Sequence, residues 1–270
     1  MAKRPPPEVT VMTVTPKTIP HSPSFVAQTE SSKQVDIVAR VSGFLDKIAY
    51  REGELVKEGQ ILFQIDPKPF QAQLAAAKAA LAQQEARLQT ARQNLARVKP
   101  LAAQNALSQK DLDDSVGQEQ AAAAAVDAAK ATVIEAELNL SYTTIRSPVT
   151  GLASRSVQRE GAYLNAQAQT AYLTYVAALD PIWVNFSVSQ NQMANATEMV
   201  AKKQLVQPKN QDFDVELVLP GGKPYSKEGK INFADPSFSQ DTGSFLVRAS
   251  LPNPKAELRP GMFVTAILKG

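Results

Sequence analysis

The chain has 270 residues, of which 29 are Lys or Arg and 26 are Asp or Glu, and its formal net charge is +3. This charge is small and scattered, and no basic cluster is interleaved with aromatic residues, so the composition argues against nucleic acid as a partner. The absence of cysteine excludes disulfides, thiol catalysis and thiolate metal sites. The single histidine, His21, lies among prolines and is best explained as an exposed loop residue.

The N-terminal segment carries no recognisable targeting signal. Its start, MAKRPPPEV, has no apolar stretch after the basic pair, and no run in the chain approaches the ~20 apolar residues of a membrane-spanning helix. We therefore expect a soluble chain, with any export signal or anchor lying outside it. The stretch EVTVMTV at residues 8–14 has the alternation of a strand.

A repeat flanks the middle of the chain. The stretch VSGFLDKIAYREG at residues 41–53 aligns with VTGLASRSVQREG at residues 149–161, at a constant offset of 108. Each copy alternates apolar and polar residues between glycine turns, which predicts short strands. We expect two half-motifs, residues 36–68 and 143–176, to pair as one β module.

The segment between the two copies, residues 69–142, is rich in alanine and has helical periodicity. Small or apolar seam residues recur at heptad spacing, and the remaining faces are polar, which predicts an antiparallel coiled-coil hairpin. Each arm would have about 30 residues, with the first ending at Pro100. Gly117 indicates either flexibility or a tolerated defect. The large seam residues are Leu74, Leu81, Leu88 and Leu95 in the first arm and Leu112, Val126, Val133 and Leu140 in the second, with Glu119 as an exception.

The last part of the chain, residues 177–270, has the pattern of a small closed β-barrel. A short helix over residues 190–203 begins with a capping box formed by Ser189 and Gln192. Residues 1–35 would supply the first barrel strand and part of an incomplete membrane-proximal β domain. Strands are predicted at residues 182–189, 212–219, 230–234, 244–251 and 262–268, with Phe186, Phe233, Phe245 and Phe263 as core.

Several motifs together resemble one protein family. They are ARVSGFLDKI with REGELVKEGQILFQID, YTTIRSPVTGL with REGAYL, then ALDPIWVNFSVS and LPNPKAELRPGMFV. The half-motifs resemble a biotinyl/lipoyl domain. From about residue 35 onward the chain resembles a periplasmic adaptor, or membrane fusion protein, of a tripartite resistance–nodulation–division multidrug efflux pump.

The resemblance implies an elongated multidomain protein that assembles as a ring of several copies in the periplasm of a Gram-negative bacterium. It would bridge an inner-membrane, proton-driven transporter and an outer-membrane channel, without catalysis, cofactor or metal. Two features depart from the family pattern. Neither a lipidated cysteine nor a membrane-spanning anchor is present, and the membrane-proximal domain stops short at Gly270. We therefore expect a trimmed chain whose inner-membrane anchor lies outside it.

The resemblance also implies a partner-binding element at the hairpin tip, matched here by Arg97, Leu101 and Ser108. Arg97 would otherwise complement the helix dipole in the last turn of the first arm. Ser108 begins a capping box with Asp111, so it would have a structural role as well. Leu101 follows Pro100 outside the heptad seam, and an exposed leucine at the end of a hairpin favours a contact with the outer-membrane channel.

Three alternatives remain. An adaptor of an ATP-driven exporter or of a type I secretion system would share the β module and the hairpin. A lipoyl or biotin carrier would need a lysine at a tight turn, and Lys68 lies between two prolines instead. A glycosidase would need paired carboxylates, for which Glu52 and Glu160 occupy equivalent places in the repeat. The usual explanation for both is an acidic turn residue.

Overall fold

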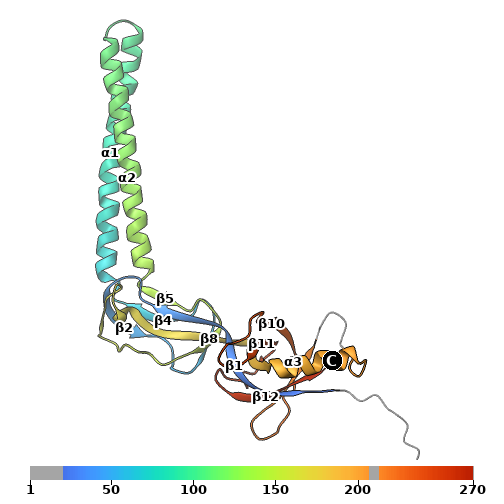
Figure 1. Cartoon of the computed structure of the whole chain (residues 1–270). Coiled ribbons are helices and arrows are strands. Elements are labelled where there is room, and N and C mark those ends of the chain that lie inside the picture. Colours follow the sequence, from blue (N-terminus) through green and yellow to red (C-terminus); the bar gives the residue numbers. More distant parts are fainter. Residues whose placement is uncertain (1–20, 207–212, 270) are drawn as a thin grey trace, which may run out of the picture. The chain divides into compact units, whose positions relative to one another are not determined.

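A computed structural model describes residues 21–206 and 213–269. It divides into two compact units, one formed by residues 33–178 and the other by residues 21–32 together with 179–269 (Figure 1). The strand predicted at residues 8–14 lies outside the described residues. Two long strands, β1 (Ser24–Val38) and β8 (Tyr172–Ser189), contribute residues to both units.

The first unit contains a β module built from both copies of the repeat. β5 and β4 pair with each other, and β2 pairs with both β4 and β7. β6 pairs with β3 on one side and with β8 on the other. The first half-motif supplies β2 (Gly43–Ile48), β3 (Leu55–Val56) and β4 (Ile61–Ile65). The second half-motif supplies β5 (Thr144–Arg146), β6 (Gly151–Ala153) and β7 (Tyr163–Leu164), followed by a short 3-10 turn at Gln169–Ala171.

The pairing of these strands follows the sequence repeat. Phe44 of β2 lies opposite Tyr163 of β7, and Leu55 of β3 lies opposite Leu152 of β6. The offset of 108 relates Phe44 to Leu152 and Leu55 to Tyr163. The two copies therefore complete each other, and they share one core that includes Leu45, Val56, Leu62, Phe63, Ile65, Leu164, Leu173 and Val176.

Gly151 shows why glycine recurs in the repeat. A methyl group added at Gly151 would lie 2.3 Å from the carbonyl oxygen of Ala177 in the neighbouring strand. At its counterpart, Gly43, an added carbon would lie 2.7 Å from the Ile65 side chain. At Gly151 the close approach of the neighbouring strand excludes a side chain, whereas at Gly43 the obstacle is the buried Ile65 side chain.

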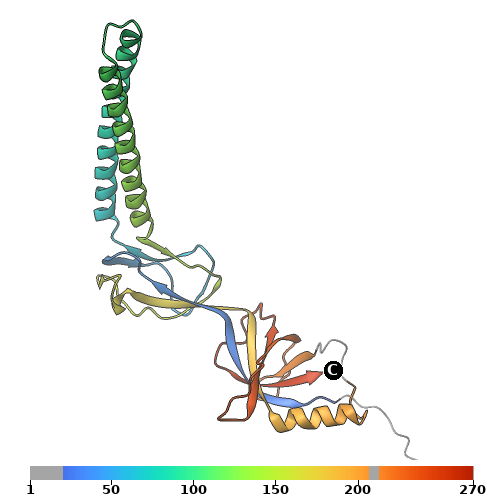
Figure 2. The same cartoon turned by 45° about the horizontal axis from the view of Figure 1, so that its top comes forward.

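Between β4 and β5 the chain forms a helical hairpin of α1 (Lys68–Ala103) and α2 (Gln109–Ser141). The two helices lie side by side along their length in both views (Figures 1 and 2). They have 36 and 33 residues, so both are longer than the arms predicted from the sequence. The buried seam residues are Ala77 and Leu88 from α1 and Ser115, Val126, Val133 and Ala136 from α2.

The polar exception in the predicted seam, Glu119, has a partner in the opposite helix. Its carboxylate lies 2.9 Å from Nε of Arg92. A second ion pair joins Lys78 and Glu137 at 3.1 Å. Exposed pairs of this kind contribute little to stability, but each is satisfied in only one alignment of the two helices. They therefore favour the observed register.

The second unit is a six-stranded closed sheet in its described part. Its strands follow the order β1-β12-β9-β10-β11-β8, and β1 also pairs with β8. The predicted capping box at Ser189 and Gln192 is confirmed, and it begins α3 (Gln190–Ala201). The other barrel strands are β9 (Asp214–Val218), β10 (Gly229–Ala234), β11 (Ser244–Leu251) and β12 (Phe263–Lys269).

The barrel core differs from the predicted aromatic set. Phe186 is buried and stacks on Phe25 of β1, at 5.3 Å between ring centroids, whereas Phe245 only packs at the edge of the core. Phe233 and Phe263 were predicted wrongly, since they remain 41% and 65% exposed. In β12 the inward positions are Val264 and Ala266, and a shift of one residue in a strand moves a side chain to the opposite face.

We predict that Gly117→Ala stabilises α2. A side chain at Gly117 would meet no atom within 4 Å, and alanine in a helix interior is favoured over glycine by about 1 kcal/mol. Amide hydrogen exchange in the surrounding turns should slow about fivefold. Gly151→Ala is the control and should instead destabilise the β module, because its added carbon would collide with the backbone of Ala177. Unchanged or faster exchange in Gly117→Ala would contradict the prediction.

Candidate functional site

The end of α1 forms the first half of the hairpin tip, and it differs from the sequence expectation. Pro100 does not end the helix, which continues to Ala103. The helix ends because Asn105 adopts a left-handed conformation with φ of 55°. The Asn105 amide donates to the Ala102 carbonyl at 3.0 Å, and the Ala106 amide donates to the Leu101 carbonyl at 2.9 Å. This is the Schellman pattern, in which asparagine is the usual substitute for glycine.

The start of α2 forms the other half of the tip. Ser108 is the N-cap: its Oγ accepts from the Asp111 amide at 3.2 Å, and its own amide donates to Asp111 Oδ2 at 3.0 Å. The predicted capping box is therefore confirmed. The hydrogen bonds from the Ser108 side chain and then from its backbone lower the pKa of the Asp111 carboxyl. Asp111 consequently stays ionised at the N-terminus of α2, where negative charge is favourable.

Leu101 and Leu107 give the tip its apolar character. Their side chains are 43% and 37% exposed. Exposure of Leu101 was predicted, but Leu107 was missed, although it directly precedes the N-cap, a position where an apolar residue could have been recognised. The tip therefore presents two leucines beside a helix N-terminus.

Arg97 lies farther from the tip than predicted. It precedes the end of α1 by six residues, so it is not in the last turn, and its Nε donates to the Gln93 carbonyl at 3.3 Å. The guanidinium is exposed and makes no ion pair within the described part of the chain. Arg97, Leu101 and Ser108 thus all lie toward the free end of the hairpin, with Arg97 on its side.

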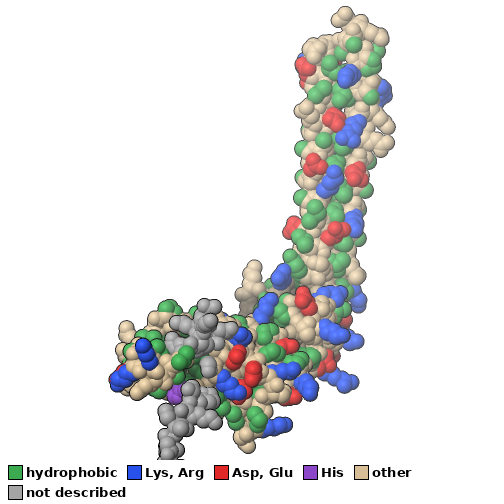
Figure 3. Space-filling model, turned by 90° about the vertical axis from the view of Figure 1, so that its right-hand side faces the viewer, with side chains coloured by type: hydrophobic (Ala, Val, Ile, Leu, Met, Phe, Trp, Pro, Cys, Tyr) green, Lys and Arg blue, Asp and Glu red, His purple; other side chains and the backbone are tan. Residues whose placement is uncertain are grey.

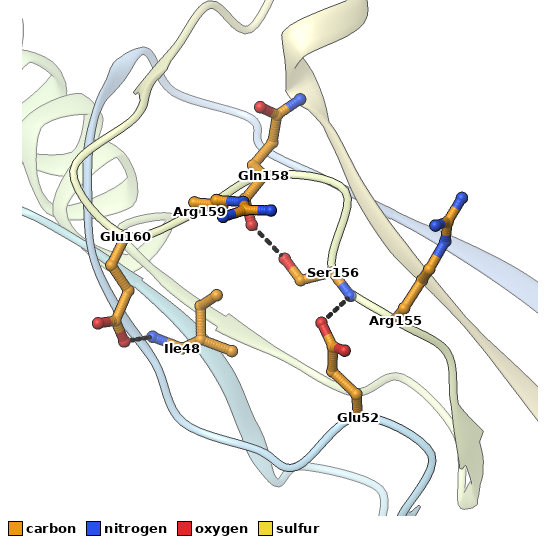
Figure 4. Close-up of a pocket in the computed structure, with 7 residues that line it drawn as sticks. All are labelled: Ile48, Glu52, Arg155, Ser156, Gln158, Arg159 and Glu160. Atoms are coloured by element: carbon orange, nitrogen blue, oxygen red, sulfur yellow. Dashed lines mark hydrogen bonds between the residues drawn. The ribbon is translucent and has the colours of Figure 1, made fainter.

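The paired carboxylates of the repeat lie at a hollow of about 550 Å³ in the β module. Figure 4 shows them directed at separate backbone amides. Glu52 Oε1 accepts from the Ser156 amide at 2.9 Å, and Glu160 Oε1 accepts from the Ile48 amide at 2.8 Å. Each carboxylate is already engaged in holding the backbone, which does not fit the pair of free carboxyl groups that a glycosidase requires.

These two hydrogen bonds are related by the sequence repeat. The offset of 108 converts Glu52 into Glu160 and Ile48 into Ser156, so each glutamate of one copy holds the same backbone position of the other copy. The carboxylates therefore tie the two halves of the module together reciprocally. The sequence interpretation of solvated turn residues missed this role, although the repeated REG motif was its signal.

The remaining candidate, Lys68, is the first residue of α1. Its backbone amide donates to Asp66 Oδ1 at 3.1 Å, and proline flanks it on both sides. This setting is a helix start and differs from the tight strand turn that a lipoyl or biotin carrier needs.

Two further site classes find no support in the described residues. No group of three or more His, Asp or Glu side chains is placed to hold a metal ion within residues 21–206 and 213–269. Among the helices that the structure describes, none has the length and apolar character needed to cross a membrane.

Comparison with known families agrees with this architecture. Residues 33–176 match the barrel-sandwich hybrid domain of resistance–nodulation–division (RND) membrane fusion proteins. Residues 181–270 match the β-barrel domain of the same proteins. The chain belongs to the RND membrane fusion protein family.

Curated members of this family match over nearly the whole chain. The efflux pump periplasmic linker BepD of Brucella suis is 36% identical over 98% of this chain and 67% of its own length. The multidrug efflux pump subunit AcrA of Escherichia coli is 34% identical, covering 97% of this chain and 66% of its own. This membrane fusion protein therefore spans about two thirds of the length of such relatives.

A related crystal structure shows the same fold. It is a MacA-MexA chimeric protein containing the MexA α-hairpin domain of Pseudomonas aeruginosa, with 28% identity and a TM-score of 0.67. The match covers 93% of this chain and 83% of the chimera. The predicted β-barrel and the family assignment are confirmed.

We predict that Glu52→Ala and Glu160→Ala act on separate amides. Glu52→Ala should speed hydrogen exchange at the Ser156 amide, and Glu160→Ala should do so at the Ile48 amide, each by several fold, because an exposed charged acceptor contributes about 1 kcal/mol. Site-resolved exchange measures both amides in each variant. If neither variant affects its own partner amide, the reciprocal tie does not exist.

Proposed function

We propose that this chain is a periplasmic adaptor of an RND multidrug efflux pump, bridging an inner-membrane transporter and an outer-membrane channel. Membership of the RND membrane fusion protein family carries the proposal, and relatives named as efflux pump linkers and subunits support it. The adaptor would perform no chemistry and hold no cofactor. It would lie in the periplasm of a Gram-negative bacterium, associated with the inner membrane through an anchor outside this chain.

Within this function, we propose that the hairpin tip docks on the outer-membrane channel. Exposed Leu101 supports this, because an apolar side chain at the end of a helical hairpin has no core to fill. Such a tip can enter a groove between helices of a partner. Ser108 would hold the start of α2 in place, and Arg97 would contact the partner from the side of the hairpin.

The contact made by one tip is small, so useful affinity would require several copies acting together. We therefore propose a ring of several adaptors, consistent with the family resemblance. Heptad packing as a coiled coil would give the hairpin the stiffness to present its tip. We propose five functional segments: residues 1–35, the lipoyl-like halves 36–68 and 143–176, the hairpin 69–142 and the barrel domain 177–270.

We predict that Leu101→Asp abolishes efflux without unfolding the hairpin. A charge at this position cannot enter an apolar groove without a desolvation cost, and the cost recurs in every copy of the ring. In a strain that lacks the native gene, the full-length variant should leave drug susceptibility close to that of the deletion strain.

The matched control is Gln89→Asp, which places the same charge on the exposed side of α1. It should keep efflux near that of the unmodified protein. Ser108→Ala should give an intermediate result, since loss of an N-cap costs about 1 kcal/mol but leaves Leu101 in place. Full efflux by Leu101→Asp at normal protein levels would rule out the tip as the docking site.

A further inference from the structure

The hairpin is joined to the β module only at its base, where β4 leads into α1 and α2 leads into β5. Among the described residues of the first unit, no other element lies beside the shaft of the hairpin (Figures 2 and 3). A helix of 36 residues is about 54 Å long, so a rotation of about 10° at the base moves the tip by about 9 Å. The contacts at the base therefore decide how precisely the tip is placed.

Gln64 of β4 connects the two strands at this base through its side-chain amide. Its Nε2 donates to the Thr143 carbonyl at 3.2 Å and to the Ile65 carbonyl at 3.0 Å. Its Oε1 accepts from Thr144 Oγ1 at 3.0 Å. A reversed amide would set its oxygen against two carbonyl oxygens, so these bonds allow one orientation of the group. Gln64, Thr143 and Thr144 are called the Gln64 clamp below.

Thr143 extends this clamp to the last turn of α2. It is only 1% exposed, and its Oγ1 donates to the Leu140 carbonyl at 2.7 Å. Its backbone amide donates to the same carbonyl at 3.1 Å, and its own carbonyl also accepts from the Ile65 amide at 2.8 Å. A continuous set of hydrogen bonds therefore runs from β4 through Thr143 into the end of α2.

The other contacts at the base are less directional. β5 has three residues, so its backbone pairing with β4 is short, and the register of that pairing shifts between Ile61 and Phe63. Phe70 and Tyr142 pack against the module core but remain partly exposed, and the guanidinium of Arg40 lies 5.3 Å from the Tyr142 ring centroid. Apolar burial is non-directional, whereas hydrogen bonds require a defined angle. The clamp is therefore the part of the base best suited to fix the angle of the hairpin.

We infer that Gln64 is a positioning residue: its amide holds the end of α2 against β4 and thereby sets where the tip meets the outer-membrane channel. This inference rests on the proposed function. Gln64 lies at the opposite end of the hairpin from the tip, so it acts through Thr143 and Thr144 and not by touching the partner. Replacing Gln64 removes the side-chain bonds of the clamp but leaves the backbone pairing of β4 with β5 in place.

The test measures the angle of the hairpin directly in the purified chain. The chain has no cysteine, so Leu55→Cys in the β module and Gln89→Cys on the shaft, both at exposed positions, introduce two spin labels. Pulsed electron paramagnetic resonance then gives the distribution of distances between them. The distribution should become about twofold wider in Gln64→Ala, because the base can open locally once the directional bonds are lost.

Two further variants make this result specific. Gln73→Ala is the matched control, since it removes an exposed glutamine of α1 outside the clamp and should leave the distribution unchanged. Thr144→Val keeps the shape of the side chain and loses only its hydroxyl, so it should widen the distribution less than Gln64→Ala. If Gln64→Ala fails to fold, Thr144→Val decides. Unchanged distributions in the folded clamp variants would show that the remaining contacts hold the hairpin, and would overturn the inference.

A second measurement separates this inference from the proposed docking of the tip. In the full-length exported protein, a cysteine at Leu101 is crosslinked to the outer-membrane channel in intact cells. The yield should fall about tenfold in Gln64→Ala, because a displaced tip in every copy weakens a contact that depends on several copies, and should stay unchanged in Gln73→Ala. A wider distribution with an unchanged yield would overturn the inference. Absence of the adduct in the unmodified background would count against the docking proposal, while the spin-label distances would still decide whether Gln64 positions the hairpin.

Discussion

The strands of the β module cannot complete their two sheets without partners that follow the hairpin in the sequence. β2 requires β7, β3 requires β6 and β4 requires β5, and each of these pairs joins one half-motif to the other. The chain must therefore return to the β module after the hairpin. An antiparallel helical pair is a simple solution, because α1 leaves directly after β4 and α2 ends directly before β5. The hydrogen bonds of Glu52 and Glu160 add a further connection between the two half-motifs, one from each half.

This constraint explains how a long hairpin can hold its position although the packing between its helices contributes little stability. Its seam buries mainly alanine, valine and a few leucines, and its exposed ion pairs add little. The paired strands fix its base, and capping motifs fix its end. The tip residues are thereby free of packing duties, and exposed Leu101 is the one that we propose makes the partner contact.

The parts of the fold that depend on local pattern were predictable from the sequence. The repeat predicted the cross-copy pairing, heptad spacing predicted the two helices, and the capping boxes at Ser108 and Ser189 were recognised by residue type. The end of α1 was not predicted, because Pro100 is a strong helix breaker by propensity. A Schellman turn at Asn105 ends the helix instead, and its signal is only one asparagine.

Features that depend on strand register or on distant contacts were harder to predict. Alternation in β12 does not reveal which face is inward, so Phe263 was wrongly assigned to the core. The engagement of Glu52 and Glu160 depends on backbone amides more than 100 residues away. The Arg248 side chain likewise lies against the rings of Trp183 and Phe233 from the two neighbouring strands, and no spacing in the sequence links these three residues.

The most direct test of the adaptor account is a comparison of crosslinking from the tip and from the shaft of the hairpin. Single cysteines at Leu101 and at Gln89, in the full-length exported protein, are treated in intact cells with a short bifunctional reagent, and the products are identified by mass spectrometry. The account predicts an adduct with an outer-membrane channel from Leu101 and none from Gln89. Equal yields from both positions, or no channel adduct from a variant that still supports efflux, would contradict it.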